Sequence, residues 1–221
     1  MLNVSRPWLA WSIFLCLSAC ISGSTARAQA VPVTALNRQL SRVDLAVSGV
    51  GQMTGGVSGT NYLHQAITQD ASTTLGALVT LRYIKSPLLG LEGNFGYARY
   101  TENFSANLNV VGGAQTKASE YTFGYVVHAP TFFGLKPFAS VGAGTIAFKP
   151  TALGGQGLPE QARLAYYYAA GVENTVFSNH FGVRAQVRQV FFKAPDFGQN
   201  YLTMNQHTST FEPGIGIFLR F

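Results

Sequence analysis

Eight segments of this chain alternate apolar and polar residues with a period of two, which is the spacing of side chains on the two faces of a β-strand. The segments are residues 42–53, 72–84, 88–102, 118–129, 135–148, 162–176, 180–193 and 208–221. No helix-period stretch of useful length follows residue 41. The sequence therefore predicts an all-β domain over residues 42–221.

The connections between these segments alternate in length. The long ones, rich in Gly, Asn, Thr and Gln, are residues 54–71, 103–117, 149–161 and 194–207, and the short ones are residues 85–87, 130–134 and 177–179. Long outer loops alternating with tight periplasmic turns are typical of barrels in an outer membrane, and an even strand count places both chain ends in the periplasm. The pattern predicts an eight-stranded antiparallel up-and-down transmembrane β-barrel.

The two faces of the predicted strands differ in chemistry. One face is apolar and carries Tyr and Phe near its ends. The other face carries six arginines and five acidic residues among small residues: Arg42, Asp44, Arg82, Glu92, Glu120, Arg163, Glu173, Arg184, Arg188, Glu212 and Arg220. Because an eight-stranded barrel has room inside only for side chains, we expect this lumen charge network to plug it. An ion path lined by Arg184 and Arg188 is the alternative.

Two ion pairs follow from the expected strand register. With a two-residue turn at 178–179, Glu173 falls directly opposite Arg184. Arg82 and Glu92 become diagonal neighbours on adjacent strands, within reach of long side chains.

Alternation alone does not decide which face points outward. A soluble secreted binding barrel would bury the apolar face and carry Lys outside, but the lysines of the strand region lie at strand ends or in loops: Lys85, Lys117, Lys136, Lys149 and Lys193. Charged residues make up 11% of the 221 residues, against about 25% in an ordinary soluble domain. These features favour a membrane barrel. The formal charge of +6 includes no Lys/Arg run, which argues against a nucleic-acid partner.

Residues 1–30 have the features of a secretory signal peptide: a basic start at Arg6, an apolar stretch over residues 8–21 and an A-x-A site before Val31. Residues 31–41 are then a short periplasmic lead-in. The alternative is a lipoprotein signal, since "LSAC" (17–20) resembles a lipobox with Cys20 as the acylated residue. Cleavage after Ala30 would leave no cysteine in the exported domain, and therefore no disulfide.

The chain ends in "FEPGIGIFLRF", in which Ile215, Ile217, Leu219 and Phe221 fall on alternate positions. With its strand count and loop asymmetry, residues 42–221 resemble the small eight-stranded outer-membrane barrels of Gram-negative bacteria, namely the OmpA-type transmembrane domain and the opacity-type proteins. The resemblance implies a place in the cell outer membrane. It also implies that these four residues form the signal read by the barrel-assembly machinery. The peptidoglycan-binding domain of larger OmpA-type proteins does not follow the barrel, so cell-wall anchoring is not implied.

Some barrels of this size are enzymes that act on lipid A, and such a deacylase would need a Ser activated by a His. The histidines are His64, His128, His180 and His207, and none forms a convincing constellation. There is no HExxH motif and no Asp-rich loop, so we expect no metal and no cofactor.

We therefore expect a non-enzymatic protein with a structural or surface-interaction role, whose binding, if any, uses the four long outer loops. The expected partners are the lipid bilayer, lipopolysaccharide and, during biogenesis, the assembly machinery. Arg99 continues the lipid face beyond Tyr97, where it would meet lipopolysaccharide phosphates. A small-solute or ion pore and a lipid A-modifying enzyme are the alternatives. The sequence does not identify a surface ligand.

Overall fold

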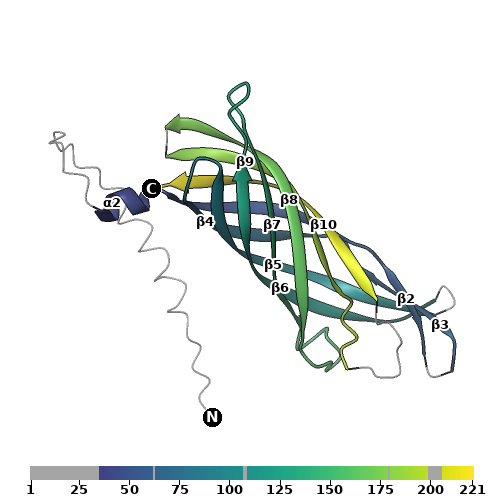
Figure 1. The fold of residues 1–221 in the computed structure, drawn as a ribbon. Coiled ribbons are helices and arrows are strands. Elements are labelled where there is room, and N and C mark those ends of the chain that lie inside the picture. Colours follow the sequence, from purple (N-terminus) through teal and green to yellow (C-terminus); the bar gives the residue numbers. More distant parts are fainter. Residues whose placement is uncertain (1–34, 62, 107–108, 179, 199–205) are drawn as a thin grey trace, which may run out of the picture. The chain divides into compact units, whose positions relative to one another are not determined.

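The computed structural model describes residues 35–61, 63–106, 109–178, 180–198 and 206–221 (Figure 1). The predicted signal peptide and Cys20 lie outside these residues, as does most of the lead-in. The described part of the predicted lead-in forms a short helix, α2 (Ala35–Leu40), before the first strand. Across the described ranges, no helix combines the length and the hydropathy that crossing a membrane would take.

Eight long strands close into an antiparallel barrel, as predicted. They are β1 (Val43–Thr54), β4 (Thr74–Ile84), β5 (Leu89–Ala106), β6 (Asn109–His128), β7 (Lys136–Pro150), β8 (Gln161–Ser178), β9 (Phe181–Lys193) and β10 (His207–Arg220). Each pairs with the next in chain order, and β10 also pairs with β1. The closed ring satisfies the backbone hydrogen bonds of every strand without exposing an edge to lipid.

Two of the predicted outer loops are largely strand. Residues 54–71 contain a hairpin, β2 (Val57–Thr60) and β3 (Ala66–Ala71), and β3 pairs with the outer part of β5. The prediction of a loop over 103–117 was wrong, because β5 and β6 stay paired as far as Ala106 and Asn109. The polar composition of residues 103–117 indicated a loop. However, β3 hydrogen-bonds the part of β5 that extends beyond β4, so β5 continues as a strand.

The outward face is apolar, and its large side chains are exposed. Leu75 is 83% exposed and Ile215 71% exposed, which is the arrangement expected of a surface in contact with lipid. One polar residue interrupts this face on β9, and it has a local partner. Gln189 lies opposite Tyr168, whose hydroxyl donates to the Gln189 Oε1 at 2.5 Å.

Candidate functional site

The half of the lumen nearer the start of β1, which the predicted orientation places on the periplasmic side, holds a compact network of five charged side chains, each at most 3% exposed. Arg82 Nε lies 2.8 Å from Glu92 Oε2, and Arg82 also pairs with Glu173. Arg184 Nη2 lies 2.9 Å from Glu173 Oε1 and 3.3 Å from Asp44 Oδ1. Glu173 is therefore shared between two arginines that come from opposite sides of the barrel.

The register explains these pairs. Glu173 lies directly opposite Arg184, as predicted, although a register shift between Thr175 and Ser178 accompanies the pairing. The prediction that Arg82 and Glu92 are diagonal was wrong, because they lie directly opposite each other. Ile84 pairs with Gly90, so the turn is longer than predicted and moves β5 by two residues against β4.

The second charge network surrounds Arg188, nearer the outer end. Arg188 Nη1 donates to Glu120 Oε2 at 2.9 Å and to Glu212 Oε2 at 2.8 Å. Glu212 Oε1 also accepts a hydrogen bond from Gln52 Nε2 at 3.1 Å. One buried arginine thus pairs with two carboxylates from strands β6 and β10.

Tyr167 joins the two networks, and the sequence analysis did not single it out. Its hydroxyl donates to Glu92 Oε1 at 2.7 Å, and its ring lies 4.3 Å from the Arg188 Cζ. Gly142 leaves room for the ring, since a Cβ there would lie 2.6 Å from the Tyr167 Cε1. The signal was present in the sequence: Tyr167 lies between two outward-facing tyrosines, so a period of two turns it inward.

The remaining predicted lumen residues lie at the two mouths of the barrel. Arg163 Nη2 pairs at 3.2 Å with Asp196 Oδ2, an acid that was not in the predicted set. Arg220 Nη2 lies 3.7 Å from Asp44 Oδ2, which is a long contact. No ion pair of Arg42 is found in the described part of the chain.

The outer third of the lumen is apolar rather than charged. Ile146, Phe148, Val190 and Phe192 are buried there, and Phe197 from the segment after β9 packs against them with 1% exposure. The amide of Phe197 donates to the Gln161 Oε1 at 3.1 Å, which fixes the segment across the mouth. We call this group the apolar cap. The cavity between it and the Arg188 network measures about 20 Å³.

A buried carboxyl lies in the hairpin extension, beyond the membrane-spanning part of β5. Glu102 Oε2 accepts a hydrogen bond from Gln69 Nε2 at 3.1 Å, and Gln69 also donates to the Pro195 carbonyl. Burial raises the pKa of Glu102 to about 7, although hydrogen bonds to Gln69 and Tyr100 oppose the shift. Glu102 thus gains a charge near neutral pH at a site that disfavours it.

Ser209 and His180 make contacts within the fold. Ser209 Oγ accepts a hydrogen bond from Gln189 Nε2 at 3.1 Å, and His180 Nδ1 contacts the Arg220 carbonyl oxygen at 2.9 Å. In the ranges that the structure covers, no three His, Cys, Asp or Glu side chains are grouped to hold a metal ion.

Comparison with solved structures shows which proteins share this architecture. Neisserial surface protein A matches with a TM-score of 0.50 and 12% identity, over 81% of this chain and 97% of that one. The outer membrane protein OprG from Pseudomonas aeruginosa matches with a TM-score of 0.56 and 12% identity, over 81% and 95% of the two chains. The chain has the fold of the small eight-stranded outer-membrane β-barrels. No family model and no curated protein matches its sequence.

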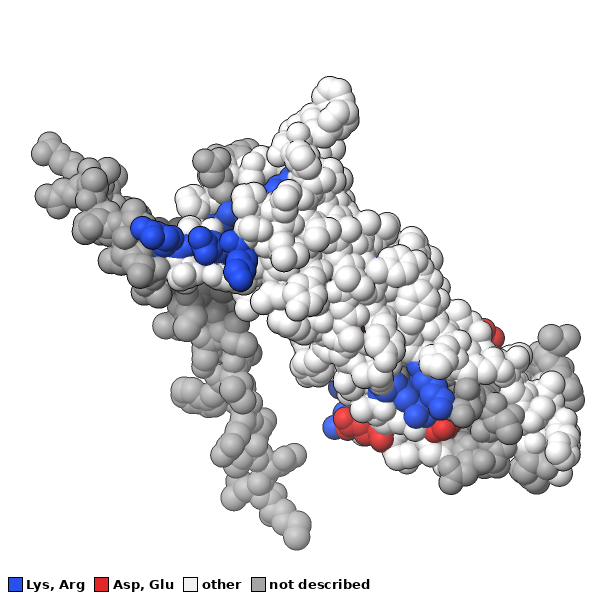
Figure 2. All heavy atoms as spheres, viewed as in Figure 1, with Lys and Arg blue, Asp and Glu red and all other residues white. Residues whose placement is uncertain are grey.

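In this outer-membrane barrel, surface charges gather near the two ends, and the visible face between them is uncharged (Figure 2). At the outer end, Arg99 lies opposite Lys117, and Lys117 lies opposite Lys149, so three strands carry neighbouring cations. Arg99 Nη2 donates to Gln115 Oε1 at 2.5 Å. Lys149 Nζ lies 3.2 Å from an exposed carboxylate, Glu160 Oε2.

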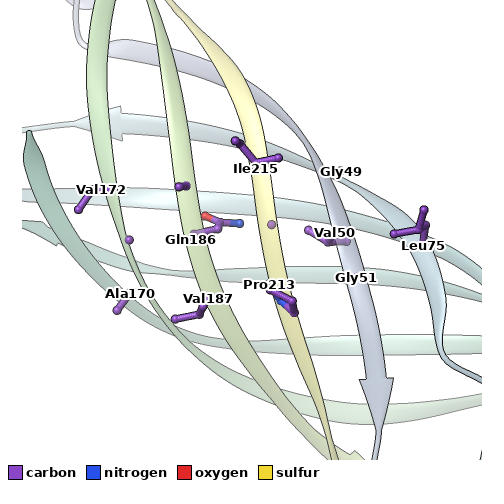
Figure 3. Close-up of a pocket in the computed structure, with 13 residues that line it drawn as sticks. Gly49, Val50, Gly51, Leu75, Ala170, Val172, Gln186, Val187, Pro213 and Ile215 are labelled. Carbon is purple, nitrogen blue, oxygen red and sulfur yellow. The ribbon is translucent and has the colours of Figure 1, made fainter.

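The seam between the first and last strands of the barrel has two distinctive features. Phe221 is half exposed, and its amide donates to the Val43 carbonyl at 3.2 Å. Further along, Pro213 lies where the β1–β10 ladder lacks pairs between Val50↔Gly214 and Met53↔Phe211, because proline has no amide hydrogen to donate. An apolar hollow of about 600 Å³ lies there (Figure 3). Glycines and apolar side chains make up most of its lining, which suits contact with lipid chains.

Proposed function

We propose that this protein is a non-enzymatic outer-membrane scaffold with a plugged lumen, and that any binding uses its outer hairpins and loops. The observation that carries the proposal is the filling of the lumen. Two charge networks joined by Tyr167 occupy it, the apolar cap covers them, and the cavity between them is about 20 Å³. That volume suits about one water molecule, not a continuous aqueous path.

Planar-bilayer conductance tests the plug against the alternative of a small pore. We expect the wild-type protein to pass almost no ions. Replacing Tyr167 and Arg188 together by Ala should open a path and produce discrete conductance steps. The matched control combines Tyr166→Ala, on the lipid face, with Arg163→Ala at the mouth, and it should stay closed. Steady conductance of the wild type would show that the lumen is a pore.

The lipid A-modifying enzyme is less well supported. Ser209, the serine nearest in sequence to His207, hydrogen-bonds Gln189 instead, and a nucleophilic Ser needs an adjacent base. Mass spectra of lipid A from cells with and without the protein should be identical. A deacylated species that appears only with the protein would revive this alternative.

Lipopolysaccharide is the proposed lipid partner at the outer rim. Arg99, Lys117 and Lys149 lie side by side on adjacent strands, and like charges in such positions repel unless an anion lies between them. Phosphate groups of the outer leaflet would supply that anion. Lys117→Gln should therefore weaken the binding of phosphorylated lipid A by detergent-folded protein, but leave the binding of dephosphorylated lipid A unchanged.

Processing and assembly are proposed to follow the sequence signals. Residues 1–30 would be removed, leaving Val31 as the N-terminus, and residues 42–221 would form the barrel. Mass spectrometry of membrane-extracted protein distinguishes this from acylation of Cys20 by the added lipid mass. Phe221, Leu219, Ile217 and Ile215 are proposed as the signal read by the assembly machinery.

A further inference from the structure

The periplasmic mouth of the barrel contains a cavity of about 310 Å³ that no role described above uses. The turn between β6 and β7 forms one side of it, and Lys136, Glu173, Phe218 and Arg220 line it. Lys136 lies directly opposite Glu173 across the β7–β8 pair. The cavity is the entrance to the periplasmic charge network.

Positive charge exceeds negative charge at this entrance. The side chains that line the cavity or lie beneath it include four cations and three carboxylates: Arg82, Lys136, Arg184 and Arg220 against Asp44, Glu92 and Glu173. Arg82 and Arg184 bind the three carboxylates closely, at 3.3 Å or less. A charge held away from bulk water needs a partner of opposite sign. The two remaining cations, Lys136 and Arg220, are therefore left without a carboxylate within hydrogen-bond distance.

The contacts of Arg220 and Lys136 agree with the excess of positive charge at this entrance. Arg220 Nη2 lies 3.7 Å from Asp44 Oδ2 and 4.0 Å from Glu173 Oε2, which are both beyond hydrogen-bond distance. The Arg220 Nε is buried without a hydrogen-bond partner among the described residues. For Lys136, no ion pair is found within the same part of the chain.

We propose that this cavity binds a small oxyanion of the phosphate or carboxylate class, which enters from the periplasm. The Lys136 ammonium and the Arg220 guanidinium would donate to its oxygens. Phe218 supports the arginine, whose Cζ lies 5.6 Å from the ring centroid. Glu173 also lines the cavity and repels an anion, so the ligand would lie against Lys136 and Arg220 and away from this carboxylate.

Inorganic phosphate is the probe, and calorimetric titration of detergent-folded protein is the measurement. The detergent should be a maltoside, since phosphocholine headgroups would compete. We expect saturable binding by the wild type and at least a tenfold loss of affinity in Lys136→Gln. Lys85→Gln removes the same charge from the exposed turn between β4 and β5, outside the residues that line the cavity, and should bind like the wild type. Acetate in place of phosphate tests whether the site also takes carboxylates.

Three results would overturn the proposal: no saturable binding by the wild type, equal affinity in Lys136→Gln, or an equal loss in Lys85→Gln. The third would indicate a general effect of surface charge. If Lys136→Gln does not fold, Lys136→Arg provides the test in its place, because it keeps the charge and should retain binding. Loss of binding in a folded Lys136→Arg barrel would also contradict the site.

Discussion

Replacing Glu173 with Gln tests the physical basis of the plugged lumen. Glu173 is 2% exposed and pairs with both Arg82 and Arg184. Glutamine keeps the volume but removes the charge, which leaves Arg184 with only a 3.3 Å contact to Asp44. Breaking a buried pair by removing one partner typically costs about 3–5 kcal/mol. With a urea slope of about 2 kcal/mol/M, the unfolding midpoint should fall by about 2 M.

The matched control is the same substitution in an exposed pair. Glu160 Oε2 lies 3.2 Å from Lys149 Nζ, and these side chains are 54% and 69% exposed. Exposed pairs contribute about 0–1 kcal/mol, so Glu160→Gln should move the midpoint by less than about 0.5 M. Both variants should be folded in the same detergent and unfolded in urea, and circular dichroism should follow the loss of β-structure.

Equal midpoints in the wild type and Glu173→Gln would refute the reasoning. That result would mean that water hydrates the two arginines, since a solvated charge loses little when its partner is removed. The lumen would then be an aqueous channel, and the conductance experiment should agree.

Three further predictions concern other parts of the barrel. The pKa of Glu102 in the folded state is about 7, against a usual 4.5. Between these two pH values the folded state binds more protons than the unfolded state. The free energy of unfolding should therefore fall as pH rises through that window, by at most roughly 3 kcal/mol. Glu102→Gln should remove this dependence, as measured by amide exchange in β3. Tyr167→Phe removes the 2.7 Å hydrogen bond to Glu92 Oε1, although Glu92 keeps donors from Arg82 and Asn94, and should cost about 1–3 kcal/mol in urea unfolding, whereas Tyr166→Phe on the lipid face should be nearly neutral. Deleting Phe221 should lower the amount of barrel assembled in cells more than the stability of barrel refolded in detergent; equal losses would make Phe221 only a packing residue.

Local patterns in the sequence were sufficient to predict the strands and their faces. A period of two is a property of neighbouring residues, so it placed Leu75 and Ile215 on one face and Arg82 and Glu173 on the other. The positions of the lysines and the low share of charged residues then indicated which face is outward. The pairing of Glu173 with Arg184 was also predictable, because a short connection joins their two strands. The register of Arg82 and Glu92 was not predictable in this way, because their turn is two residues longer than the polar segment 85–87 indicated.

The contacts across the lumen were decided only by the tertiary structure. Arg188 and Glu120 are 68 residues apart in the chain, and they meet because closure of the barrel places β9 and β6 on facing sides. Tyr167 joins the two networks, and Phe197 completes the apolar cap, for the same reason. A strand pattern shows that a side chain points inward, but strand tilt and closure determine which side chain it meets there.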